Sequence, residues 1–255
     1  MVRPLFTEED LLAVPDAPWG VWRIVRALVL IAIVVLAAQF IALRIAWNVK
    51  WGDAPKMHFA DVAGRGAFAG ISLTVTAWVA ALVMVPLLRS MVNEETRPWQ
   101  FLGFKRVGTK QVLAWCGAAL LLIVVTAGLI SFVNDYSYVA GMLKAYATVP
   151  PVLLFTAFVI AAPVSEELLF RGLLLSALDS RGTPVWISAC LSSALWAALH
   201  VQYDLFLMGT IFFSGLLLAA ARRKTGSIYP CIAMHALNNA VSFAEMAYFA
   251  ANGSP

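Results

Sequence analysis

The chain has 255 residues, of which 62% are hydrophobic and only 13% are charged. This balance lies well outside that of soluble globular domains and predicts an integral membrane protein. The formal net charge is +4, and no basic tract resembles a phosphate-binding patch, so we expect no nucleic-acid partner. Composition therefore directs attention to the apolar runs and to the polar residues inside them.

The first residues precede any apolar run and carry the acidic residues Glu8, Glu9 and Asp10. A signal peptide begins instead with a short basic region followed by a short apolar core. We therefore expect residues 1–23 to form a cytoplasmic tail that is retained.

Seven apolar runs are each long enough to cross about 30 Å of hydrocarbon as a helix, at about 1.5 Å per residue. They cover residues 27–47, 66–88, 112–133, 152–178, 185–201, 205–222 and 228–250. The sequence therefore predicts an all-α, polytopic membrane helix bundle of about seven transmembrane helices, in contact with membrane lipids. Thirteen of the 18 Lys and Arg residues fall in the tail, in alternate loops or in the adjoining parts of the apolar runs, which predicts a cytoplasmic N-terminus. In a prokaryote the membrane would be the plasma (inner) membrane.

Two adjacent carboxylates, Glu166 and Glu167, interrupt the run 152–178, and Arg171 follows the second by four residues. An ionised group in hydrocarbon costs several kcal/mol, so such residues pair, line a cavity or do chemistry. The four-residue spacing predicts an ion pair between Glu167 and Arg171 on one helical face. Glu166 points about 100° away around the helix and has no local cation. We therefore expect Glu166 to be the reactive carboxylate, acting as a general base.

Two histidines also lie inside apolar runs. Asn239 follows His235 by four residues in the last run, so one helical face presents an imidazole and a carboxamide side by side. His200 lies at the end of the run 185–201. Counting depth at about 1.5 Å per residue places Glu166 and both histidines within the hydrocarbon. We therefore predict one polar pocket to which three separate helices contribute.

Three motifs, in this order, resemble those of the CAAX protease and bacteriocin-processing family of intramembrane endopeptidases, also called the abortive-infection family. They are EExxxR, FxxxH with Trp in place of Phe, and HxxxN, carried here by Glu166, Glu167, Arg171, Trp196, His200, His235 and Asn239. Because Trp keeps an aromatic side chain, we expect the replacement of Phe to affect only local packing. The resemblance covers about residues 97–245. Together with the apolar runs it predicts N-terminal transmembrane helices over 24–150, followed by catalytic core helices over 151–251 that carry the three motifs.

The same resemblance implies a role for each motif. Glu166, assisted by His200, would activate a water that attacks a peptide carbonyl. His235 and Asn239 would stabilise the developing oxyanion, while Glu167 and Arg171 would support the site. The implied substrate is a membrane-associated peptide or protein that is hydrophobic or lipidated, and in eukaryotic relatives it is a prenylated C-terminus.

Two histidines and a carboxylate are also the ligand set of a catalytic zinc site, with Glu166, His200 and His235 as candidate ligands. The HExxH helix motif is absent from the sequence, and Asn239 is a poor zinc ligand. We therefore prefer a metal-free mechanism and keep a divalent metal such as zinc as the alternative.

Other classes of protein also place polar residues in apolar helices. In a proton-coupled transporter, Glu166, His200 and His235 would relay protons, although no inverted repeat supports this class. A non-catalytic immunity or scaffold protein would keep the fold without the reaction. In a purely structural bundle the polar side chains would only hold helices together. These alternatives stay open at the level of sequence.

Overall fold

A computed structural model describes residues 20–51, 74–84, 98–133 and 149–253, together with Val139, Leu143, Tyr146 and Ala147. Every regular element within these residues is a helix, and no strand occurs among them. Most of the expected N-terminal tail, up to residue 19, and both ends of the run 66–88 (residues 66–73 and 85–88) lie outside the described residues.

Within the described residues, each of the seven apolar runs contains a helix, although residues 199–201 and 228 at the ends of two runs are not helical. The helices are α2 (Val21–Trp51), the helix Thr74–Met84, α6 (Thr109–Val133), the helix Pro151–Asp179, α11 (Val185–Ala198), α12 (Leu205–Thr225) and α13 (Tyr229–Asn252). The short helix α5 covers Pro98–Phe101. Three stretches are long and apolar enough to cross a membrane: Thr109–Phe132, Pro151–Asp179 and Leu205–Thr225. The all-helical membrane architecture is therefore confirmed, whereas the number of seven spans stays a prediction.

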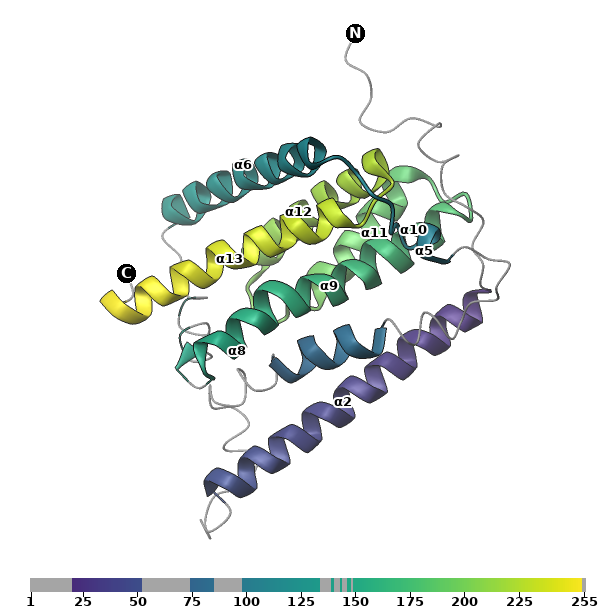
Figure 1. Ribbon diagram of the computed structural model, residues 1–255. Coiled ribbons are helices and arrows are strands. Elements are labelled where there is room, and N and C mark those ends of the chain that lie inside the picture. The colour runs from purple at the N-terminus through teal and green to yellow at the C-terminus, as the bar shows by residue number, and fades with distance from the viewer. Residues whose placement is uncertain are drawn as a thin grey trace.

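The C-terminal helices pack as a bundle. α12 packs against α11 and α13, and α13 also contacts α6. In Figure 1 these helices run roughly side by side, while the purple α2 lies at the outer edge of the protein. The helix Thr74–Met84 lies between α2 and the bundle. Its Thr76 hydroxyl accepts a hydrogen bond from Gln39 of α2. On the other side, its Ala77 packs on small residues of the helix Pro151–Asp179. The polar residues of the three motifs thus come from helices of this bundle.

The helix Pro151–Asp179 is continuous but changes its hydrogen-bond register twice. Its parts are α8 (Pro151–Phe155), η1 (Thr156–Ala161), α9 (Ala162–Glu167), η2 (Leu168–Leu174) and α10 (Leu175–Asp179), where η1 and η2 are π-helical. In π-helical segments each N–H bonds five residues back, and such segments concentrate at functional sites. The two adjacent carboxylates lie at the end of α9, between the two π-helical segments. Their directions are thus set by backbone that departs from regular α-helix on both sides.

One buried ion pair joins three helices near the α12–α13 turn. Arg223 of α12 donates from Nε and Nη2 to the two carboxylate oxygens of Asp179 in α10, at 2.9 and 2.7 Å. Ser188 of α11 donates to the same carboxylate and accepts from Arg223 Nη2 at 2.6 Å. Because charge and hydrogen-bonding groups are matched, this bidentate contact fixes the relative positions of the three helices at that end of the bundle.

Gly215 marks a close approach of α12 to α11 and to Arg171. A Cβ added there would lie 2.7 Å from Cβ of Ser193 and 3.0 Å from Nη2 of Arg171. Since all of these atoms are buried, we expect Gly215→Ala to lower the free energy of unfolding by about 1–3 kcal/mol, measured by unfolding in mixed detergent micelles. Gly209→Ala on the same helix is the matched control, because its Cβ meets nothing within 4 Å. Equal stability of the two variants would contradict the close packing.

Candidate active site

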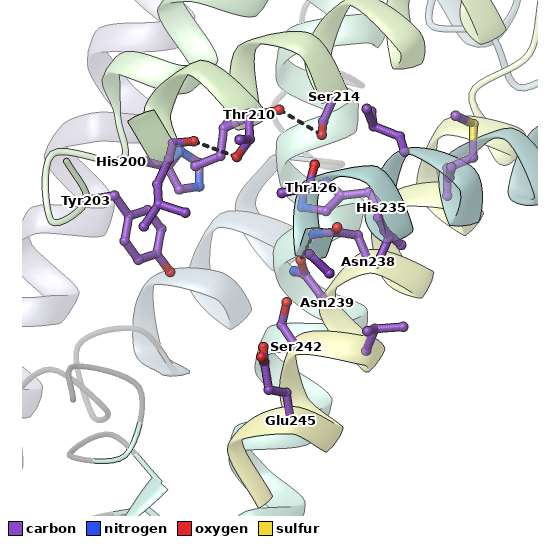
Figure 2. Close-up of a pocket in the computed structure, with 18 of the residues that line it drawn as sticks. Thr126, His200, Tyr203, Thr210, Ser214, His235, Asn238, Asn239, Ser242 and Glu245 are labelled. Carbon is purple, nitrogen blue, oxygen red and sulfur yellow. Dashed lines mark hydrogen bonds between the residues drawn. The ribbon is translucent and has the colours of Figure 1, made fainter. Parts of the chain in front are cut away.

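A cavity of about 820 Å³ lies among α6, η1, α9, α11, α12 and α13 and the loop between α11 and α12. All four residues expected to act on the substrate line it: Glu166, His200, His235 and Asn239. Figure 2 shows His200 and Tyr203 on one side and a column of polar side chains along α13, from His235 to Glu245, on the other. The cavity therefore has polar groups on two walls, whereas the residues that α6 contributes are mostly apolar.

Glu166 is the carboxylate that opens into the cavity, with 31% of its side chain exposed. Its Oε2 accepts a hydrogen bond from Nε1 of Trp196 at 2.6 Å and lies 3.9 Å from Nε2 of His235. Among the described residues, none donates a hydrogen bond to the other oxygen, Oε1. The expectation that Trp196 affects only packing is therefore wrong, because its indole N–H binds the carboxylate directly.

Glu167 faces away from the cavity, into the packed interior, and is completely buried. Its Oε1 accepts a hydrogen bond from Arg171 Nη1 at 3.2 Å, which is the pair expected from the four-residue spacing, and from His235 Nδ1 at 2.9 Å. A carboxylate bound at Nδ1 places a proton on that nitrogen and orients the ring. Glu167 therefore turns Nε2 of His235 toward Glu166. Sequence spacing could not reveal this contact, because the two residues are 68 positions apart.

Asn239 binds a backbone carbonyl that has lost its usual partner. In η1 the N–H of Ala162 bonds to the carbonyl of Ala157, five residues back. In this register the next carbonyl, that of Phe158, would need the N–H of residue 163, and Pro163 has none. Nδ2 of Asn239 donates to the Phe158 carbonyl at 2.8 Å instead. One N–H of the Asn239 carboxamide thus anchors α13 to η1, and the second N–H of the same nitrogen stays available.

His200 lies just beyond the end of α11 and lines the cavity from the side of the α11–α12 loop. Its Nδ1 is 3.0 Å from the carbonyl of Trp196, so an N–H there donates to that carbonyl and leaves Nε2 for the cavity. The His200 ring stacks on the ring of Tyr203 at 6.1 Å, with 13° between the planes. Sequence analysis missed Tyr203, although its place in the short loop after His200 could have drawn attention to it.

The candidate metal ligands do not form a metal-binding group. Within the described ranges, no three His, Cys, Asp or Glu side chains are arranged to hold a metal ion. His235 and Glu166 face each other, but Oε2 of Glu166 accepts the Trp196 N–H, and His200 contacts a carbonyl and an aromatic ring. The three residues have the donor types of a catalytic zinc site, but within the described part of the chain they are not arranged as the ligands of one metal ion.

Comparison with known proteins finds a family match over the segment that contains Glu166, His200, His235 and Asn239. Residues 148–241 match the family described as type II CAAX prenyl endopeptidase Rce1-like. A protein of Escherichia coli described as an uncharacterized 24.3 kDa protein is 35% identical over 100 residues, which are 37% of this chain and 46% of that protein. The chain thus spans just under half the length of that relative. No solved structure matches the chain.

Proposed function

From the match of residues 148–241 to the family described as type II CAAX prenyl endopeptidase Rce1-like, we propose that the protein is an intramembrane endopeptidase. It hydrolyses a peptide bond of a membrane-associated peptide or protein that is hydrophobic or lipidated. The observation that supports the proposal is the convergence of Glu166 and His235, 3.9 Å apart, on a cavity among apolar helices. The prediction of a plasma-membrane protein with a cytoplasmic N-terminus belongs to the same proposal.

The proposed reaction uses Glu166 as the general base. Oε1, which accepts no hydrogen bond from any described residue, takes a proton from a water in the cavity. The resulting hydroxide attacks the carbonyl carbon of the peptide bond, and Glu166 then returns the proton to the leaving nitrogen as the C–N bond breaks. His200 assists in holding the water through its Nε2. Atoms and charge balance without a further reactant.

Two side chains of α13 would stabilise the oxyanion. Asn239 offers the N–H that the Phe158 carbonyl does not use. His235 offers Nε2–H when both of its nitrogens carry protons, while Nδ1 stays bound to Glu167. Donors that are already oriented before the reaction stabilise developing negative charge at little reorganisation cost. In this scheme Glu167 and Arg171 support the site by orienting His235.

The cavity walls suggest how a substrate would lie. On α6, residues such as Leu122, Ile123 and Ile130 offer an apolar surface for a hydrophobic side chain or a lipid chain. On α13, Asn238 and Ser242 offer hydrogen-bonding groups for the backbone of an extended peptide. In this proposal the core helices over 151–251 supply the reacting groups, and the preceding helices supply part of the binding surface.

Comparative peptide analysis of membranes tests the proposal. Vesicles that contain the wild-type protein are expected to generate peptide termini that vesicles with Glu166→Ala lack, because only the wild type can activate water. Both proteins must be present at equal level and inserted to the same extent. Identical sets of termini would remove the endopeptidase assignment. Adding a strong chelator tests the metal-free form, since loss of cleavage together with one zinc per wild-type chain would overturn it.

A further inference from the structure

We infer that Trp196 is a positioning residue whose indole N–H fixes Oε2 of Glu166 and so leaves Oε1 to act on water. This inference rests on the proposed function. Nε1 of Trp196 lies 2.6 Å from Oε2 of Glu166, and the Trp196 residue is only 5% exposed. A hydrogen bond to an ionised acceptor is roughly twice as strong as one between neutral groups. The contact therefore joins α11 to the reactive group of α9.

The orientation of the indole is set by neighbours on other helices. The guanidinium carbon of Arg171 lies 4.4 Å from the centre of the indole ring, a distance typical of a cation–π contact. The ring of His235 meets the indole edge to face, with centres 5.1 Å apart and 73° between planes. Since packing holds the ring from two sides, Nε1–H stays directed at Glu166.

The N–H also opposes a competing contact. Oε2 of Glu166 lies 3.9 Å from Nε2 of His235, at the outer limit of an ion pair with a protonated imidazole. A small rotation of an unheld carboxylate would bring the two groups into a direct, hydrogen-bonded ion pair. Such a pair would engage both the proposed base and the proposed oxyanion donor. By holding Oε2, Trp196 keeps the two groups apart and available. Phe, which the FxxxH motif has at this position, has no polar atom and could not do this.

Trp196→Phe tests the inference, because it keeps an aromatic ring and removes the N–H. We expect kcat to fall about tenfold or more, the effect of losing a hydrogen bond to a charged group. KM should change less than about twofold, because Phe keeps an aromatic ring at this place in the cavity wall. Trp186→Phe is the matched control on the same helix: its side chain is 67% exposed, and we expect it to keep wild-type kcat. The measurement is steady-state cleavage in reconstituted vesicles.

A second replacement separates the N–H from the shape of the ring. Benzothienylalanine at position 196 keeps the two-ring shape and carries sulfur in place of N–H, so we expect the same fall in kcat with unchanged thermal stability. Wild-type kcat in this variant would overturn the inference, and so would wild-type kcat in Trp196→Phe. If Glu166→Gln were inactive in that same experiment, the proposed function would stand without the Trp196 role. An inactive wild-type protein would remove both.

Discussion

Glu166→Gln is expected to lower kcat for peptide cleavage by about 10²–10⁴-fold, the usual contribution of a general base. A carboxamide cannot take a proton from water, yet its oxygen can still accept the Trp196 N–H that Oε2 accepts in the wild type. The Glu166 side chain is 31% exposed, and its distance to His235 Nε2, 3.9 Å, is too long for a direct hydrogen bond. We therefore expect the free energy of unfolding to stay close to the wild-type value. Steady-state cleavage and unfolding in mixed micelles measure the two quantities.

Two outcomes of the Glu166→Gln experiment would contradict the role of Glu166 as general base or leave its rate loss to the fold. A general base usually contributes at least about 10²-fold to the rate. If the variant kept more than about a tenth of wild-type kcat, the loss would be too small for that role, and Glu166 would not be the general base. If activity and stability fell together, the loss would reflect the fold. Only loss of rate in a stable, inserted protein supports the assignment.

Glu167→Gln is expected to lower both rate and stability. Glu167 and Arg171 are completely buried, and removing one charge leaves the other unpaired, which costs about 3–5 kcal/mol in buried ion pairs. The substitution also weakens the hydrogen bond between Glu167 Oε1 and His235 Nδ1, which is 2.9 Å long in the wild type. The orientation of the imidazole therefore becomes less defined. We expect a fall in kcat and a lower free energy of unfolding, measured by the same two assays.

The neighbouring glutamates serve as controls for each other. The same substitution at adjacent positions should preserve stability at 166 and reduce it at 167. The double variant Glu167→Gln with Arg171→Gln should recover part of the lost stability, because no unpaired charge remains, but should not recover the rate. Wild-type stability in Glu167→Gln would show that the ion pair does not stabilise the fold.

The contrast between Glu166 and Glu167 follows from their places around one helix. Successive residues of an α-helix differ by about 100° in direction, so one carboxylate turns into the cavity and the other into the packed interior. Glu167 is neutralised there by Arg171 and hydrogen-bonded to His235 Nδ1, whereas Glu166 accepts the neutral N–H of Trp196 and lies 3.9 Å from His235 Nε2. One helix can thus carry a structural charge and a reactive charge side by side.

The positions of the helices and the pair between Glu167 and Arg171 were readable from the sequence, because both depend on local spacing. Apolar runs mark the segments that avoid water, and residues four apart share a helical face. The predicted convergence on a cavity also emerged from the motifs, since three apolar helices each carried polar residues at depth.

The contacts between helices were decided only by the tertiary structure. Trp196 reaches Glu166 across 30 positions, His235 reaches Glu167 across 68, and Asn239 reaches the Phe158 carbonyl across 81. Each contact depends on how one helix is rotated and shifted against another, and local spacing does not determine either quantity. That Pro163 has no N–H to donate was visible in the sequence. Which carbonyl lacks a partner depends on the π-helical register of η1, and the side chain that replaces the donor depends on the packing of α13 against η1.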